Sequence, residues 1–345
     1  MAVVAYNEYR ARQDQAALKA AQDILVTKHG LVQPARKHLA PEYSDKDDRL
    51  VADPPSDPKQ LLDPDTLTLA HYQDAKAKKQ AVDWDALQTV LEKATGKKII
   101  AQEFLNGAGE IAAIKAGKIQ LVAPHAADTP YIVNNAGFVP FAVLGDEAGA
   151  HGNHLDLAVS AMSKIQTLAD VRGHTLTCTA PDSITGYRAA VAVLSQEAAM
   201  RPDVDYFIIF SLGQKRSVEG LVGGDFEVAA LSDDTVQKKL KDGAIKQSDY
   251  RVIYESQVIP RLTIGYVYNL KPELAAKVTA AVLDFKNEGG VAEETDKPMH
   301  FFAVDYKKDF EFVRNIDDSF DPRFSKAPKA KSPAAGSAGD GATTD

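Results

Sequence analysis

The sequence is poor in cysteine, since Cys178 is the only one in 345 residues. A single thiol cannot close an intramolecular disulfide or build a cysteine-rich metal site, so both are excluded. Cys178 stands in the strand-like stretch 174–179, where we expect a small buried side chain. No stretch of the sequence approaches the roughly 18 to 20 apolar residues that a membrane-spanning helix needs. The chain is too long for one compact core, and two lobes are expected.

The chain also lacks an excess of basic residues. It has 40 Lys and Arg against 48 Asp and Glu, which gives a formal net charge of −8 at pH 7. A phosphate backbone requires a basic protein face, so we expect no nucleic-acid partner. A small anionic ligand remains compatible with this charge, because backbone dipoles close to a site can outweigh a distant net charge.

Changes in composition divide the chain into five segments. Apolar residues recur every three or four positions over residues 5–28, as in a helix, and a stretch rich in Pro and Asp follows up to Asp65. From Thr66 onward, short strand-like runs alternate with helical periods, which is typical of an α/β domain. The expected segments are an N-terminal helix and Pro-rich linker at 1–65, a first α/β lobe at 66–155, a second α/β lobe at 156–265, C-terminal helices and a strand returning toward the first lobe at 266–322, and a disordered tail at 323–345.

This organisation predicts a two-lobed α/β clamshell with mainly parallel sheets, a hinge and an N-terminal helical extension. Ligands of such folds lie at the carboxyl ends of the strands, between the lobes. The residues that directly follow strands are therefore the first candidates for ligand contacts.

The most informative phrase of this kind is Ala180–Tyr187, which lies between a strand and a helix. The first N–H groups of a helix have no internal partner and carry the positive end of its dipole. Ser183 and Thr185 add hydroxyl donors, and Gly186 lets the backbone approach closely. The set suits a tetrahedral oxyanion. On the local sequence alone, a simple helix N-cap at Ser183, worth about 1 kcal/mol, explains the phrase as well.

Four phrases, in order over about 250 residues from Thr66 to Ile316, resemble the phosphate/phosphite/phosphonate-type substrate-binding proteins of ABC transporters. They are EIAAIKAGKIQLVAP, SKIQTLADVRGHTLTCTAPDSITGY, FSLGQKRSVEGLVGGDFEVAALSDDT and YRVIYESQVIP. The resemblance implies a periplasmic-type fold whose two lobes close around ligand by a hinge motion. It also favours the anion-binding interpretation. The candidate contacts that match or adjoin the family's anion loop are Ser183, Thr185, the Gly186 backbone and Tyr187.

The sequence departs from the family pattern at several positions. Ile184 stands at a family hydroxyl position, which removes one donor. Gln214 stands where a histidine is usual; it can still donate one hydrogen bond to a ligand, but it cannot become cationic. The acidic residue that would meet a ligand amine has become Leu262 or Thr263, so a simple oxyanion is favoured over an aminophosphonate. Family tyrosines are replaced around Asn106 and Gly107, and at Asn153 or His154.

Four further residues are candidate ligand contacts, and each has a structural alternative. His125 follows a strand end, with Thr129 and Tyr131 close behind it, although a helix N-cap and a core tyrosine explain this group equally. His154 is a candidate donor in the cleft. A metal site of His151 and His154 lacks further ligands, so we expect no metal. We also expect no cofactor, because the sequence has neither a Gly-x-Gly-x-x-Gly motif nor a P-loop.

These observations predict a receptor for a small phosphorus oxyanion (phosphate, phosphite or phosphonate), with an ABC permease or a membrane sensor as its partner. No enzyme activity is expected, because PDSITGY is not a Gly-x-Ser-x-Gly nucleophile elbow. The alternative is a sensory or interaction module with altered or lost ligand binding, suggested by the N-terminal helix and linker. The resemblance implies a periplasmic or cell-envelope location. Since the first residues lack the layout of a secretory signal, we expect the native start to differ.

Overall fold

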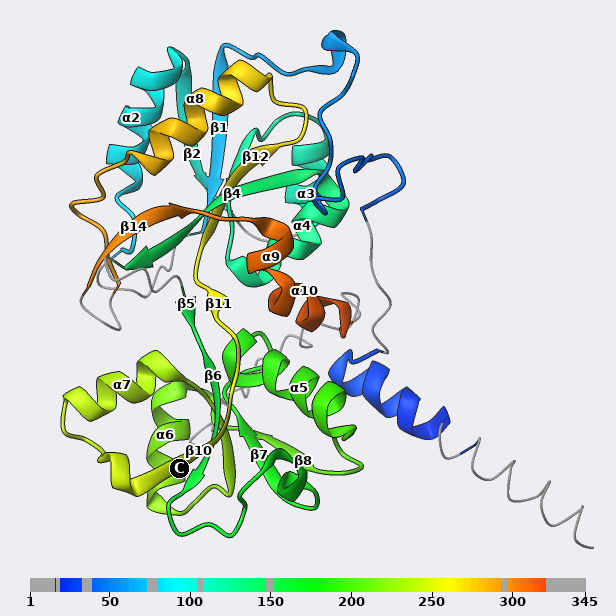
Figure 1. Ribbon diagram of the computed structural model, residues 1–345, viewed down its shortest axis with the longest axis vertical. Coiled ribbons are helices and arrows are strands. Elements are labelled where there is room, and N and C mark those ends of the chain that lie inside the picture. The colour runs from blue at the N-terminus through cyan, green and yellow to red at the C-terminus, as the bar shows by residue number, and fades with distance from the viewer. Residues whose placement is uncertain are drawn as a thin grey trace, which may run out of the picture.

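Figure 1 shows the computed structural model of the chain, in which two α/β lobes are stacked along the longest axis. The structure describes residues 16, 19–32, 39–72, 80–104, 108–146, 152–292 and 297–320. No helix in these ranges is long and apolar enough to cross a membrane. The expected two-lobed α/β architecture is confirmed.

The first lobe is built on a seven-stranded sheet with the strand order β13-β14-β4-β12-β3-β1-β2. The pairs β1–β2 and β1–β3 are parallel, whereas β12, β4, β14 and β13 are joined by antiparallel pairing. Helices α2 and α8 pack together on one face of the sheet, and α3 and α4 lie on the other (Figure 1). The elements are β1 (Thr66–His71), α2 (Trp84–Thr95), β2 (Lys98–Glu103), α3 (Ala108–Lys115), β3 (Leu121–Ala123), α4 (Thr129–Ala136), β4 (Phe138–Asp146), β12 (Thr263–Val267), α8 (Pro272–Leu283), β13 (Val291–Ala292), β14 (Lys297–Ala303), α9 (Tyr306–Asp309) and α10 (Glu311–Asp318).

The second lobe is built on a five-stranded sheet with the order β10-β6-β9-β7-β8. Strand β7 pairs in parallel with β8 and β9, whereas β6 is antiparallel to β9 and β10. Both sheets are therefore mixed rather than mainly parallel. In the second lobe, β6 leads the chain away from the hinge, whereas its neighbours β9 and β10 run toward the hinge. The elements are β6 (Leu155–Ser160), β7 (Thr175–Cys178), α5 (Ala189–Ala198), β8 (Phe207–Phe210), α6 (Gln214–Gly223), β9 (Val228–Ser232), α7 (Asp233–Lys241) and β10 (Tyr250–Glu255).

Two short crossing strands connect the lobes. Strands β5 (Gly152–Asn153) and β11 (Ile259–Pro260) form an antiparallel pair between the two sheets (Figure 1). A Cβ atom at Gly152 would lie 2.0 Å from the carbonyl oxygen of Ile259, so the crossing requires a glycine there. Strand β12 already belongs to the first sheet, so the second lobe ends before the boundary expected at residue 265.

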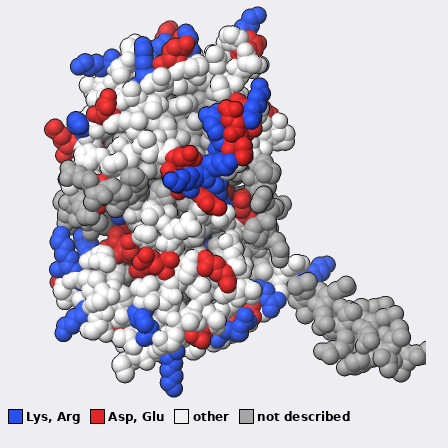
Figure 2. Space-filling model, viewed as in Figure 1, with Lys and Arg blue, Asp and Glu red and all other residues white. Residues whose placement is uncertain are grey.

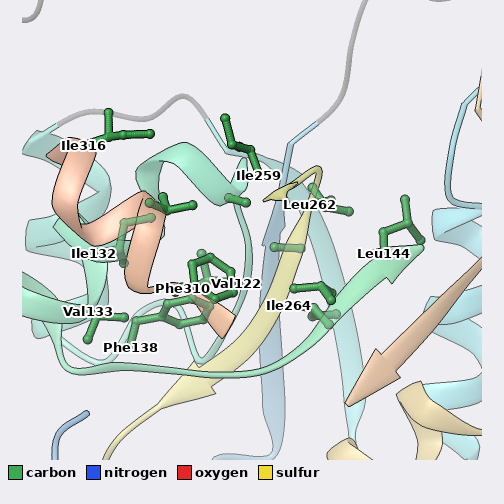
Figure 3. Packing of buried hydrophobic residues seen from close by; sticks show 14 of the residues in the cluster. Val122, Ile132, Val133, Phe138, Leu144, Ile259, Leu262, Ile264, Phe310 and Ile316 are labelled. Atoms are coloured by element: carbon green, nitrogen blue, oxygen red, sulfur yellow. The ribbon is translucent and has the colours of Figure 1, made fainter. Parts of the chain in front are cut away.

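The apolar pattern of the sequence explains the first-lobe core. Leu67 and Leu69 alternate along β1, and Leu87 and Leu91 lie one helical turn apart on α2; all four side chains are fully buried. Figure 3 shows the C-terminal residues Phe310 and Ile316 packed beside Ile132, Val133 and Phe138. Burial of each such side chain stabilises the fold by about 2 kcal/mol. The C-terminal helix α10 therefore packs on α4 of the first lobe, and it also contacts α5 of the second lobe.

The N-terminal part of the chain lies against both lobes. Residues 19–29 are helical and lie beside the second lobe (Figure 1). The segment expected to be a linker lies along the surface of the first lobe. There the Tyr43 ring packs edge-on against Tyr268, and Leu62 forms an isolated bridge with Leu270. Residues 5–15 of the expected helix and the tail at 323–345 lie outside the described residues.

Candidate functional site

The Ser183 turn, defined as residues 183–188, leads from β7 into α5. Residues Ile184–Arg188 form a π-helical turn with Ser183 as the N-cap, and Ser183 Oγ accepts a hydrogen bond from the Gly186 N–H (3.0 Å). The Gly186 amide is thus occupied by Ser183, and its contact with a ligand stays a prediction. The N–H groups of Ile184 and Thr185 are the first two of the helix and have no intrahelical acceptor. Together with the hydroxyl hydrogens of Ser183 and Thr185, they are the donors that the turn offers to an anion.

Gly186 also has a packing role. A Cβ atom at this position would lie 1.9 Å from Thr179 Oγ1 and 2.8 Å from Ser183 Oγ. Thr179 is buried, and its hydroxyl has no hydrogen-bond partner in the described part of the chain. Its N–H donates to the Gly186 carbonyl (2.9 Å). Only glycine permits this approach, which holds the Ser183 turn against the end of β7.

Gln214, the first residue of α6, connects the Ser183 turn to the next strand end. Its Nε2 lies 3.4 Å from Thr185 Oγ1, and its Oε1 accepts a hydrogen bond from the Ser232 N–H (3.0 Å). The three residues follow or end the parallel strands β7, β8 and β9, at the edge of the sheet that faces the first lobe (Figure 1). The structure therefore brings together Thr185 and Gln214, two of the candidates from the sequence.

A chain of polar contacts continues from Ser232 to the hinge. The Asn153 Nδ2 donates to Ser232 Oγ (2.9 Å) and to Asp234 Oδ2 (3.0 Å), and a guanidinium nitrogen of Arg261 lies 3.0 Å from the same Asp234 oxygen. The Asn153 Oδ1 is buried and has no hydrogen-bond partner in the described part of the chain. We call the chain from Thr185 through Gln214, Ser232, Asn153 and Asp234 to Arg261 the interlobe network.

On the first-lobe side, Tyr72 and His125 follow strands β1 and β3, whose carboxyl ends point toward the second lobe (Figure 1). Their ring centroids are 3.7 Å apart, and His125 is exposed. The His125 Nδ1 donates a hydrogen bond to the carbonyl oxygen of Arg261 (3.3 Å), the residue at the end of the interlobe network. The candidate His125 is thus placed where a first-lobe contact would be needed.

Two other candidates have packing roles. Thr129 is fully buried, and its hydroxyl donates to Thr263 Oγ1 (3.0 Å), which joins α4 to β12. This burial favours the structural role of Thr129, and its contact with a ligand stays a prediction. Tyr187 is also buried, and its hydroxyl lies 3.0 Å from His29 Nδ1 in the N-terminal segment. Its hydroxyl is thus used by a residue of the N-terminal segment.

The remaining candidates are less constrained. The His154 Nδ1 donates to the Ser256 carbonyl (2.6 Å), a contact that joins β5 to the end of β10. Tyr131 is half-buried on α4, and its role stays a prediction. His151, Asn106 and Gly107 lie outside the described residues. Within those that are described, no group of three His, Cys, Asp or Glu side chains is placed to hold a metal ion.

Acidic groups gather where the lobes meet. Figure 2 shows acidic side chains at mid-height on the face in view, with basic side chains scattered over both lobes. Burial, together with the nearby Asp233 and Glu255, raises the pKa of Asp156 to about 7. Burial likewise raises the pKa of Asp233. An anion at this level would therefore depend on neutral hydrogen-bond donors more than on full positive charges.

Sequence reasoning did not find Tyr72, Asp234 or Arg261 as parts of this region. Tyr72 directly follows the strand-like run that begins at Thr66, so the rule that selected His125 could have selected it too. Asp234 lies in the first turn of α7, beside Asp233. Cys178 is a buried side chain as expected, and burial raises the pKa of its thiol.

Comparison with known proteins identifies the group to which this architecture belongs. A sequence profile described as "ABC transporter, phosphonate, periplasmic substrate-binding protein" matches residues 71–304, more than half of the chain. The chain belongs to this family. The profile thus covers both sheets of this substrate-binding protein except for most of β1, together with Tyr72, His125, the Ser183 turn and the interlobe network.

Individual relatives agree with the assignment. The phosphate-import protein PhnD of Mycolicibacterium smegmatis is 28% identical over 279 residues, which cover 74% of this chain and 86% of that protein. XAC2383 from Xanthomonas citri bound to ATP superposes with a TM-score of 0.58 at 13% identity, covering 74% of this chain and 98% of that one. The same protein bound to chloride ion has a TM-score of 0.54 at 16% identity, covering 74% and 98%. These two structures show similarity of fold.

Proposed function

We propose that this protein captures a small phosphorus oxyanion (phosphate, phosphite or phosphonate) between its lobes and delivers it to an ABC-type permease. The observation that carries the proposal is the contact of Thr185 with Gln214 beside the uncapped amides of the Ser183 turn. Amides at a helix start and neutral hydroxyl donors suit a tetrahedral oxyanion. Membership of the phosphonate-binding family and the name of the mycobacterial relative support this ligand class.

The proposed role is binding without chemistry. A binding protein needs differential affinity between its open and closed forms, and no bond has to be made or broken. The family works as the periplasmic component of a transporter, so we place this protein in the periplasm or cell envelope. Its partners are the small ligand and the permease, with no nucleic acid.

Isothermal titration calorimetry on the purified chain tests the proposal directly. Phosphate, phosphite and methylphosphonate are titrated, with sulfate as a tetrahedral control. Thr185→Val removes one hydroxyl and keeps the side-chain shape, so we expect about tenfold weaker binding of whichever oxyanion binds the wild type. The matched control is Thr89→Val on α2, an exposed threonine whose hydroxyl bonds only to the Asp85 carbonyl (3.0 Å) in its own helix. A wild-type chain that binds none of the three phosphorus oxyanions contradicts the proposal.

The second candidate is a sensory module on the same fold. It is favoured by residues 19–32 and 306–320, which contact the second lobe. Both segments lie outside the range that the family profile matches. A transport receptor does not need such an extension. Genes for a permease and an ATPase beside this one support transport, whereas a gene for a membrane kinase supports sensing.

A further inference from the structure

The N-terminal segment ends in a histidine that is inserted into the second lobe. His29 closes the π-helical turn Leu25–His29, and Gly30 follows in the left-handed conformation with φ 69°. The imidazole is only 5% exposed. Its Nε2 lies 2.7 Å from Asp203 Oδ2, and its Nδ1 lies 3.0 Å from the Tyr187 hydroxyl oxygen. Both ring nitrogens are therefore used by the second lobe.

The partners of His29 define its protonation and tautomer. Burial lowers the pKa of His29, against the opposing effect of Asp203, so the ring is neutral at pH 7.5. A carboxylate can only accept, so Nε2 carries the proton and donates it to Asp203. The Nδ1 lone pair then accepts from the Tyr187 O–H. The charged and titratable groups that face the ring are Lys28, Asp203 and Tyr187, and Lys28 also forms an ion pair with Asp203.

Tyr187 belongs to the Ser183 turn itself. It lies two residues after Thr185 in the π-helical turn, and its ring packs edge-on against Phe210 and Phe320. Its hydroxyl is buried, and His29 is the partner that the structure gives it. Loss of that partner would leave a buried hydroxyl unsatisfied, which costs free energy unless the turn shifts. The orientation of the turn is thereby linked to His29.

The same N-terminal segment also contacts the C-terminal end of the first lobe. Leu31 forms an isolated antiparallel bridge with Phe320, and the Val32 N–H donates to the Ser319 carbonyl (2.7 Å). Beside them, the Arg188 guanidinium lies 3.4 Å from Asp317 and 5.1 Å from the centre of the Phe320 ring. The back of the Ser183 turn is thus enclosed by residues that lie outside the range matched by the family profile.

We propose that His29 is a positioning residue for oxyanion binding, which acts through the Tyr187 hydroxyl to hold the Ser183 turn in its binding conformation. The inference rests on the proposed function, because it assumes that the turn contacts the ligand. His29 itself does not touch the ligand. Its role is to fix the direction of the free N–H groups of Ile184 and Thr185. A tetrahedral anion binds tightly only when these groups point at its oxygen atoms.

Calorimetry with phosphate and methylphosphonate on three full-length variants tests the inference. Tyr187→Phe removes only the hydroxyl, and His29→Gln replaces the imidazole that accepts a hydrogen bond from that hydroxyl. At pH 7.5 we expect each to weaken oxyanion binding about five- to tenfold. The matched control is Tyr254→Phe, which removes the hydrogen bond from Tyr254 to Glu197 (2.6 Å) elsewhere in the second lobe and leaves affinity unchanged. Thermal unfolding of the ligand-free proteins shows that each variant is folded.

A pH series separates positioning from general loss of stability. When His29 is protonated, its Nδ1 becomes a donor and no longer accepts from Tyr187. The oxyanion affinity of the wild type should then fall toward that of Tyr187→Phe. The ratio of variant to wild-type Kd cancels the ionisation of the ligand and should approach one as the pH falls through the lowered pKa of His29. A ratio that stays constant across the titration of His29, or variants that bind as wild type at pH 7.5, overturns the inference alone. Wild-type protein that binds no oxyanion overturns the proposed function and this inference with it. If His29→Gln does not fold, Tyr187→Phe carries the same test.

Discussion

The carboxylate of Asp234 in the second lobe lies 3.0 Å from the guanidinium of Arg261, whose backbone is held by the first lobe. Asp234 is buried and opens α7, whereas Arg261 is about one-fifth exposed and follows the crossing strand β11. The ion pair therefore spans the two lobes beside the hinge. It also ends the interlobe network that begins at Thr185.

Arg261→Gln removes the cation of this pair and leaves a buried carboxylate. We expect the free energy of unfolding to fall by about 2 kcal/mol, because a buried charge without its partner is costly. We also expect a wider distribution of lobe orientations, measured as a larger radius of gyration in small-angle scattering. Lys307→Gln breaks the exposed pair with Asp48 and should change stability by about 0.5 kcal/mol or less. Equal effects of the two substitutions contradict the interlobe role of Arg261.

Ser183→Asp separates capping from anion binding. Aspartate is as good an N-cap as serine, so we expect the helix and the unfolding temperature to be preserved. Its carboxylate repels an oxyanion at the same turn, so binding of phosphate or methylphosphonate should be lost in calorimetry. Ser183→Ala serves as the comparison, because it removes the cap without adding charge. Loss of the cap should lower the free energy of unfolding by about 1 kcal/mol. An aspartate variant that binds the oxyanion as tightly as wild type shows that Ser183 is only a cap.

Gly186→Ala should destabilise the second lobe. The new Cβ would lie 1.9 Å from Thr179 Oγ1, so the turn or Thr179 has to move. Such overpacking costs about 1–3 kcal/mol, measurable by urea denaturation. Thr179→Ala combined with Gly186→Ala removes the nearest contact and should recover part of the loss. A single variant as stable as wild type contradicts the close packing of this turn.

Asp156 makes stability depend on pH in a defined direction. It is 6% exposed, its Oδ1 has no hydrogen-bond partner among the described residues, and burial with Asp233 and Glu255 raises its pKa to about 7. Between pH 4 and 7 the folded state therefore binds a proton that the unfolded state has lost, so this group's contribution to stability falls as the pH rises. Asp156→Asn abolishes that dependence. We expect the variant to be more stable than wild type by about 1–2 kcal/mol at pH 8 and to lose the advantage near pH 4. An advantage that is the same at both pH values contradicts the assignment.

The local elements followed from the sequence because their patterns are local. The strand-like run that begins at Thr66 became β1, a helical period after it became α2, and the phrase Ala180–Tyr187 lies between a strand and a helix as expected. A helix start also limits which backbone donors are free, so the anion-binding interpretation of the Ser183 turn could be reached before any fold was known.

The tertiary structure decided which side chains meet. His125 and Thr129 were selected together behind one strand end, and Tyr187 with the anion-loop phrase. In the structure Thr129 lies buried against Thr263 and Tyr187 against His29, whereas His125 remains exposed beside Tyr72. Their partners come from other segments of the chain, and periodicity within one segment contains no information about contacts with another. For the same reason, the sequence by itself determined two α/β lobes and a polar turn, whereas only the packing of the N-terminal segment and the crossing strands connected that turn to His29 and to Arg261.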